Sequence, residues 1–442
     1  MLRCKSWFSV IVLVAGLSGM FVAGTAWASP AKKTTIHVLV RTGIEADGMK
    51  EAADYYNKNV GSKTGINVVI DEIGRHGYLT RVVTMLLGRS PKYDATFLLS
   101  NYVGELASAG VIESLDGYFA DKELYPYDKE KVGFLPVSFK SVNYKGEIYA
   151  FPFVISTMFL YYRKDLIDNP ERLSTWDGFL DLAKQFTKSH NPASPTEFGT
   201  VMQGKSGECM PKEWYVYFWS FGGEFFGPNW KPQFNSPAAV EALKYKVDLV
   251  RKYKVVPPDV DTYEYMEVLS ALATGKVPFA IQWDAAYPDN IQKETEGKIA
   301  NIAIRVTPHK EGVDPAAFTH TWTFSINAYS KHKEETFRFL AWLTSDPEGS
   351  LWVAKRMSIP LPTKQVFFNS DVLAVNPQWE FMFNFMEQYG RAEVAIPEWP
   401  VIHDTINTFF SLAFAGEITP EAACELVNTK VEDIMKRGGY YK

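Results

Sequence analysis

The sequence holds little that metal or cofactor chemistry requires. It has three cysteines and seven histidines among 442 residues, and the histidines are scattered singly from His37 to His403. His-Glu-x-x-His, Cys-x-x-Cys and Gly-x-Gly-x-x-Gly do not occur, so zinc sites and dinucleotide binding lack their usual motifs. The serine hydrolase motif Gly-x-Ser-x-Gly is also missing. We therefore expect no metal, no cofactor and no catalysis.

One string, from Gly199 to Ser206, does match the phosphate-binding pattern Gly-x-x-x-x-Gly-Lys-Ser. A true phosphate-binding loop follows a buried strand and opens a helix. Residues 192–198 instead hold two prolines and little apolar sequence, and Gly207 and Pro211 interrupt the segment that follows. We interpret the match as coincidental.

Basic residues are outnumbered, because 46 Lys and Arg face 51 Asp and Glu, which gives a net charge of −5. Without a basic cluster the chain cannot neutralise phosphates, so we expect no nucleic acid partner. Beyond Cys4, the remaining cysteines are Cys209 and Cys424. A disulfide between these two and a pair of unpaired buried thiols both remain open.

Apolar runs long enough to cross a membrane are missing beyond the first 28 residues. The uncharged stretch 148–162 has 15 residues, whereas a spanning helix needs about 20. The N-terminus combines Arg3 and Lys5 with an apolar segment that ends in Ala26-Trp27-Ala28, as a signal peptide does. We expect cleavage before Ser29. Since Cys4 precedes the apolar segment, a lipid anchor is not expected, and the mature protein should be periplasmic.

Strand and helix patterns alternate in the first third of the chain. Residues 36–40, 66–70 and 94–98 are typical of buried strands, and apolar residues recur at helical spacing between them, over 49–60 and 79–86. This order predicts a parallel sheet covered by helices. The chain is long enough for two domains but shows no flexible linker, so we expect ordered strands at 148–162 and 279–284 to pass from one domain to the other.

Several sequence blocks follow one another in a specific order and spacing: Tyr93–Phe97, Gly104–Asp116, Tyr144–Pro152, Tyr161–Leu166, Thr175–Phe179, Ala273–Ile281, Trp322–Ile326 and Ala413–Ala423. Through these blocks, over nearly the whole mature sequence, the chain resembles the extracellular solute-binding proteins of the maltose-binding type, family 1 of ABC importers. The resemblance implies an α/β, two-lobed periplasmic-binding-protein fold of type II with the ligand cleft between the lobes. It implies an N-lobe of 29–150 plus 285–370 and a C-lobe of 151–284 plus 371–442.

The resemblance also implies a function and partners. The protein would be a monomer that closes around a small polar solute, expected to be a sugar or polyol, and delivers it to a transmembrane permease. The aromatic content of 15% suits stacking on sugar rings. One rival is an exported glycoside hydrolase, for which Glu147 and Asp284 are the nominal carboxylates.

Candidate ligand-binding residues follow strand ends or lie in the crossing segments, where ligand sites of open α/β sheets occur. Asn101 can alternatively cap the helix near Val103, Ser156 and Thr157 can be plain strand residues, and the segment that holds Trp214 is mainly core. The full set is Asn101, Tyr102, Ser156, Thr157, Glu213, Trp214, Trp283, Asp284, Tyr287 and Trp322.

The chain departs from the family where maltose-binding members carry an aromatic residue and two acids. Here those positions are Leu98, Asn101 and Ser156, so maltose is not expected as the ligand. Arg75 and His76 follow the second strand and offer positive charge to an anion. A phosphorylated or acidic solute is therefore an alternative ligand.

Overall fold

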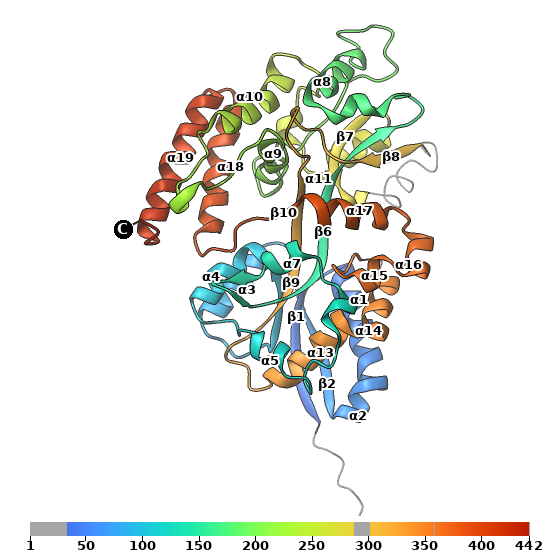
Figure 1. Cartoon of the computed structure of the whole chain (residues 1–442), viewed down its shortest axis with the longest axis vertical. Helices are drawn as coiled ribbons and strands as arrows, with labels where there is room; N and C mark the ends of the chain where they lie inside the picture. The colour runs from blue at the N-terminus through green and yellow to red at the C-terminus, as the bar shows by residue number, and fades with distance from the viewer. Residues whose placement is uncertain (1–32, 287–300, 358, 442) are drawn as a thin grey trace, which may run out of the picture.

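Two α/β halves share strands that run through the middle of the molecule. The computed structural model describes residues 33–286, 301–357 and 359–441. The half with β1 (Thr34–Arg41), β2 (Ile66–Ile73) and β3 (Ala95–Leu99) is called the N-lobe, and the half with β7 (Phe279–Trp283) the C-lobe. Figure 1 shows the N-lobe below and the C-lobe above.

The N-lobe has the predicted parallel sheet. β1 lies between β2 and β3 and pairs in parallel with both, for example Ile36 with Val68 and Val38 with Ala95. The crossover helices are α1 (Ile44–Tyr56) and α3 (Tyr78–Leu87). Buried apolar residues alternate with partly exposed ones along β1 until Val38–Val40, which are fully covered. The predicted strand and helix order of the first hundred residues is confirmed.

Two long strands continue from one lobe into the other. The first half of β6 (Phe151–Arg163) pairs with β9 (Ala317–Ile326), and its second half pairs with β7 and with β8 (Ile302–Arg305). β9 in turn pairs antiparallel with β3 and parallel with β10 (Gly390–Arg391). The crossing predicted at 148–162 is therefore present. The crossing predicted at 279–284 is wrong, because among the described residues β7 pairs only with the second half of β6, and β9 crosses instead.

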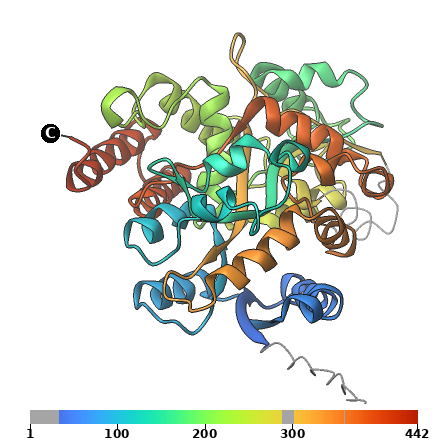
Figure 2. The ribbon, with the colours of Figure 1, turned by 60° about the horizontal axis from the view of Figure 1, so that its bottom comes forward.

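Helices cover both lobes and join distant parts of the chain. In Figure 2 the helices of residues 333–357 lie beside the first helix of the chain, where Tyr56 meets the Trp342 ring at a centroid distance of 5.0 Å. The remaining helices are α2 (Ser62–Thr64), α4 (Val103–Ser108), α5 (Asp116–Ala120), α6 (Lys129–Val132), α7 (Pro136–Lys140), α8 (Trp176–Gln185), α9 (Cys209–Ser220), α10 (Pro237–Arg251), α11 (Tyr265–Ala273), α13 (Lys333–Ser345), α14 (Pro347–Met357), α15 (Lys364–Phe367), α16 (Ser370–Val375), α17 (Gln378–Tyr389), α18 (Trp399–Ala415) and α19 (Pro420–Arg437).

Some expectations from the sequence fall on residues that the structure does not describe, and others concern membrane helices and the cysteines. The predicted signal peptide and Tyr287 lie outside the described residues. Within the described ranges, no helix is long and apolar enough to cross a membrane. Cys209 on α9 and Cys424 on α19 are both free thiols. The residue limits of the two lobes stay a prediction, since β6 and β9 belong to both.

Candidate functional site

Side chains from both lobes meet where β6 and β9 pass between them. The register of these strands places Ser156 opposite His320 and Val154 opposite Trp322, while Trp322 also faces Leu99 at the end of β3. His320 and Trp322 share one face of β9 because side chains alternate along a strand. β7 then brings Trp283 opposite Met158 of β6. Five of the predicted residues are thus gathered by strand pairing: Ser156, Trp283, Asp284, Trp322 and, just after β3, Asn101. The Thr157 side chain is fully buried on the other face of β6, and only its backbone N–H reaches Asp284.

Asp284 is a partly buried carboxyl at the end of β7. Its Oδ1 accepts a hydrogen bond from the Thr157 backbone N–H at 3.0 Å, and the Tyr161 hydroxyl donates to the neighbouring Trp283 carbonyl at 2.9 Å. Burial raises the pKa of Asp284 to about 7, although backbone N–H groups and the Ser156 hydroxyl oppose the shift. Asp284 therefore changes charge near neutral pH, which is unusual for an aspartate.

Trp322 is flanked by an arginine that sequence reasoning missed. The Phe97 ring stacks on Trp322 at a centroid distance of 4.8 Å, and the Arg41 guanidinium carbon lies 4.1 Å from the Trp322 ring centroid. Arg41 ends β1, so the strand-end rule that pointed to Asn101 would also have pointed to Arg41. The cation and the two rings form one rigid wall of the site.

Two arginines of the N-lobe, Arg41 and Arg75, share the Glu45 carboxylate as a partner. Arg41 and Arg75 each form an ion pair with Glu45, and the Arg75 Nε also donates to the Thr42 carbonyl at 2.9 Å. The side chain of Glu45 is only 12% exposed and that of Arg41 22%, whereas that of Arg75 is 52% exposed. The guanidinium of Arg75, considered in the sequence for an anionic ligand, is thus already paired with a carboxylate of the protein.

The C-lobe contributes a network of charged groups at the starts of α9 and α18. The Lys212 Nζ lies 2.5 Å from Glu208 Oε1; the Lys212 side chain is 2% exposed and that of Glu208 is 50% exposed. Lys212 is the main cause that lowers the pKa of Glu208 to about 2. Burial lowers the pKa of Lys212, but Glu208 and Glu393 more than offset this, and the net shift is upward.

Glu393 and His403 extend this network into the C-lobe core. Glu393 Oε1 accepts a hydrogen bond from the Trp399 indole at 3.0 Å and lies 3.4 Å from the His403 Nδ1. The same ring nitrogen is 2.9 Å from the Tyr215 hydroxyl. On the strand side, burial, and after it Lys212, hold the pKa of His320 well below its usual range. His320 is therefore neutral and offers one donor and one acceptor nitrogen.

Tyr102 belongs to the N-lobe, and the short turn that holds it contacts α18 of the C-lobe. Burial, followed by the charges of Glu208, Asp404, Glu105 and Glu393, raises the pKa of Tyr102 to about 12. Its phenol therefore keeps its proton at neutral pH and can donate a hydrogen bond.

The buried neighbour Asn101 has an Oδ1 without a partner among the described residues. α4 begins after Tyr102 without a side-chain cap. The alternative that Asn101 caps this helix is therefore wrong.

Glu213 and Trp214 are not brought together with the others. The Glu213 and Lys246 side chains are both 0% exposed, with Lys246 Nζ 3.6 Å from Glu213 Oε1, and Glu213 also accepts from the Gln203 N–H at 2.6 Å. Trp214 stacks on Phe218 at 4.6 Å within the same core. Both residues are therefore buried in the C-lobe core and are not part of the surface of the site described above.

The carboxylate pair of the hydrolase alternative is not assembled either. Glu147 is exposed on the hairpin of β4 (Asn143–Tyr144) and β5 (Glu147–Ile148) and accepts from the Tyr149 hydroxyl at 2.9 Å. Asp284 directly follows β7 in the other lobe, where its partner is the Thr157 N–H rather than Glu147. The coincidental phosphate-loop match also lacks its structural context, because residues 201–204 are neither strand nor helix and α9 starts only at Cys209.

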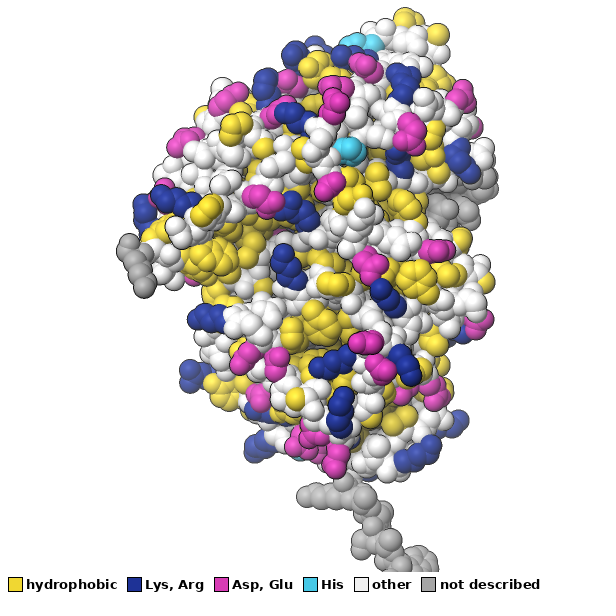
Figure 3. Space-filling model, viewed as in Figure 1, with side chains coloured by type: hydrophobic (Ala, Val, Ile, Leu, Met, Phe, Trp, Pro, Cys, Tyr) yellow, Lys and Arg dark blue, Asp and Glu magenta, His cyan; other side chains and the backbone are white. Residues whose placement is uncertain are grey.

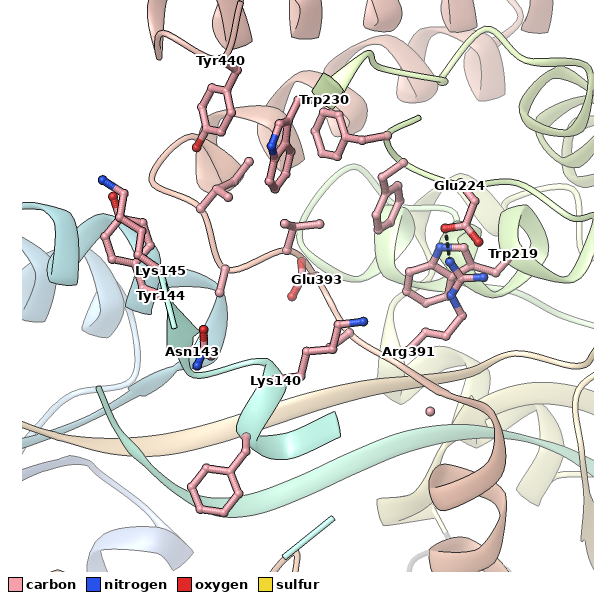
Figure 4. Close-up of a pocket in the computed structure, with 18 of the residues that line it drawn as sticks. Lys140, Asn143, Tyr144, Lys145, Trp219, Glu224, Trp230, Arg391, Glu393 and Tyr440 are labelled. Atoms are coloured by element: carbon pink, nitrogen blue, oxygen red, sulfur yellow. Dashed lines mark hydrogen bonds and ion pairs between the residues drawn. The ribbon is translucent and has the colours of Figure 1, made fainter. Parts of the chain in front are cut away.

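A separate cavity of about 1200 Å³ opens beside the segment from Gly390 to Ile396. None of the nine predicted residues that the structure describes lines it. Figure 4 shows Tyr144 and Lys145 of the N-lobe on one side and Trp230 and Tyr440 of the C-lobe on another, with Arg391 paired to Glu224. The cavity touches the first site only through Glu393. The first site, unlike this cavity, lies at the carboxyl ends of β1 and β3, where ligand sites of open α/β sheets occur.

The surface carries charges of both signs. Figure 3 shows Lys and Arg intermingled with Asp and Glu over the face in view, without a broad region of one sign.

Comparisons with known proteins agree with this architecture. The family model described as bacterial extracellular solute-binding protein matches residues 42–349. A mannitol-binding protein of Pseudomonas aeruginosa is 26% identical over 387 residues, which cover 82% of this chain and 85% of the relative. The ABC transporter solute-binding protein of Agrobacterium vitis, solved with bound D-mannitol, is 25% identical, with a TM-score of 0.72 and coverage of 92% of this chain and 100% of that one.

A third comparison supports the fold alone. The ABC transporter solute-binding protein of Agrobacterium radiobacter in complex with ribitol has a TM-score of 0.74 at 21% identity, covering 92% of this chain and 100% of that one. The predicted type II, two-lobed fold is thereby confirmed.

Proposed function

The chain belongs to the family of bacterial extracellular solute-binding proteins, and we propose that it binds a neutral polyol or sugar between its lobes for an ABC importer. The observation that carries this proposal is the internal pairing of the cations in the site. Arg41 and Arg75 share Glu45, and Lys212 is bound by Glu208. With Glu393, whose charge also acts on Lys212, three carboxylates balance these three cations, so the site presents polarity without net positive charge.

An anionic ligand is disfavoured by the same pairing. A phosphate or carboxylate binds well where Arg or Lys has no other carboxylate to satisfy. Here a bound anion would compete with Glu45 or lie near Glu208, at a cost from like-charge repulsion. A neutral chain of hydroxyl groups can instead donate to Asp284 and accept from Tyr102, because each hydroxyl is both donor and acceptor.

Aromatic side chains give the site its second property. Trp322 is partly exposed beside Arg41, and Trp283 meets His320 edge to face at a centroid distance of 5.6 Å. Flat rings with polar groups at their edges match the apolar faces and hydroxyl rims of sugars and polyols. The named ligands of the relatives, mannitol and ribitol, belong to this chemical class.

We further propose export by the N-terminal signal peptide, action in the periplasm as a monomer, and delivery of the ligand to a transmembrane permease. Lobe closure would complete the site, since Tyr102 comes from one lobe and Glu208 from the other. Asn101, Tyr102, Ser156, Trp283, Asp284 and Trp322 remain our proposed ligand contacts, to which we add Arg41, His320, Glu208 and Lys212.

Calorimetric titration tests the proposal with D-mannitol, ribitol and mannitol 1-phosphate. We expect saturable one-to-one heat with at least one neutral polyol, weaker or no heat with the phosphate, and recovery of the unchanged polyol afterwards. Binding of the phosphate alone would contradict the neutral-ligand proposal, and conversion of the ligand would contradict the proposal of a binding protein.

A further inference from the structure

A glycine of the N-lobe lies against the backbone that enters the last helix pair of the C-lobe. Gly104 is the second residue of α4, and a Cβ built on it would stand 2.7 Å from the Ala395 carbonyl carbon and 2.7 Å from the Ile396 N and C atoms. Ordinary contacts of a Cβ begin at 3.4 Å. No side chain fits at this position without moving one backbone away from the other by about 0.7 Å.

The two sides of this contact belong to different lobes. Val103 and Leu106, which lie on either side of Gly104 in α4, belong to the same N-lobe core cluster as Leu39 and Leu98. Ile396 instead accepts a hydrogen bond from the Trp399 N–H at 3.1 Å, which ties it to the first turn of α18. Figure 1 shows α4 in the lower half and α18 in the upper half. The contact therefore joins parts that would move relative to one another when the lobes open.

The contact lies beside the proposed ligand site. Gly104 is two residues after Tyr102, whose pKa responds to Glu208, Asp404 and Glu393 of the C-lobe. Ala395 is two residues after Glu393. A displacement between Gly104 and Ala395 is thus transmitted to groups that would face the ligand from both lobes.

We propose that Gly104 is a positioning residue for lobe closure, because its missing side chain allows the lobes to approach until Tyr102 and the C-lobe acids face one ligand. The affinity readout of this inference rests on the proposed function, whereas the lobe arrangement can be measured independently. Gly104 does not contact the ligand in this account.

The test compares Gly104→Ala with two control variants. Alanine favours a helix over glycine, so the variant should not lose helix stability, yet its dissociation constant for D-mannitol should rise by about tenfold or more. Gly117→Ala in α5 is the matched control, since a Cβ there meets no atom within 4 Å, and its affinity should stay unchanged. Gly178→Ala creates a clash inside the C-lobe, with the Arg172 carbonyl oxygen at 2.0 Å. It should lower the melting temperature without changing affinity.

Small-angle X-ray scattering of each variant, without ligand and with saturating D-mannitol, reads the lobe arrangement directly. We expect Gly104→Ala to be less compact than the wild type in the presence of ligand, while Gly117→Ala matches the wild type. Scattering curves and dissociation constants equal to those of the wild type would overturn the inference. If the wild type does not bind D-mannitol, the choice of ligand is wrong. The scattering curves without ligand then decide the role of Gly104. A Gly104→Ala protein less compact than the wild type supports that role, and a curve equal to that of the wild type overturns it.

Discussion

Replacing Asp284 by asparagine should change how stability depends on pH. The carboxyl has a pKa of about 7 in the folded protein against 3.8 in the free side chain, chiefly because of burial. Between these values the folded state binds more protons than the unfolded state, so stability falls as pH rises through this window. The amide that replaces the carboxyl does not titrate in this range. The stability of Asp284→Asn should therefore not show this fall with rising pH.

The magnitude follows from the shift in pKa. A shift from 3.8 to about 7 corresponds to at most about 4 kcal/mol at pH 8, and partial exposure of the side chain reduces this to about 2 to 4 kcal/mol. The difference in unfolding free energy, Asp284→Asn minus wild type, should rise by that amount between pH 4 and pH 8. The side-chain carbonyl of the variant can still accept from the Thr157 N–H, as the Asp284 Oδ1 does in the wild type.

Urea denaturation at several pH values from 4 to 8 measures this difference. Asp261→Asn, at an exposed position, controls for the removal of one acidic charge from the protein. A difference between Asp284→Asn and wild type that stays constant over the whole range would refute the argument that burial of Asp284 sets its pKa. The same variant should bind D-mannitol more weakly, since it loses a charged acceptor.

Three further predictions concern Trp322 and Glu45 on the N-lobe side of the site and Glu213 in the C-lobe core. Trp322→Ala should weaken D-mannitol binding by about tenfold or more, measured by calorimetry, and unchanged affinity would remove Trp322 from the site. Glu45→Gln frees Arg41 from its carboxylate, so we expect tighter binding of mannitol 1-phosphate than in the wild type; no gain would argue against the pairing as the basis of neutral-ligand selectivity. Glu213→Ala leaves the buried Lys246 unpaired and should cost about 3 to 5 kcal/mol of stability in urea. Weaker ligand binding by the folded variant would contradict its placement in the core.

Features that depend on local sequence were predictable. The strands and helices of the first hundred residues follow from apolar periodicity, and Ser236 and Thr419 cap α10 and α19 with their hydroxyls. Each of these strands, helices and caps depends only on residues within one turn or one strand.

The second crossing strand was missed for a physical reason. β9 mixes threonines with aromatic residues, and nothing within it distinguishes a strand that passes between lobes from one that stays in a single sheet. Its role depends on partners in β3 and β6, which lie far away in the chain, as in the pairing of Phe324 with Phe151 and Phe97.

The charged part of the site was missed for the same reason. Lys212 looks in the sequence like a residue of a helix surface, yet it is buried between Glu208 of its own helix and Glu393 from the far end of the chain. Only the fold brings these groups together. Arg41 differs, because its place directly at the end of a predicted strand was a signal that could have been used.

A crystal structure of the protein grown with D-mannitol tests the central claim most directly. We expect electron density for one polyol between Trp322 and Asp284 on one side and Glu208 on the other, with Tyr102 within hydrogen-bonding distance. Density in the cavity beside Trp230 and Tyr440 instead, or no bound polyol in a protein that calorimetry shows to be saturated, would contradict it.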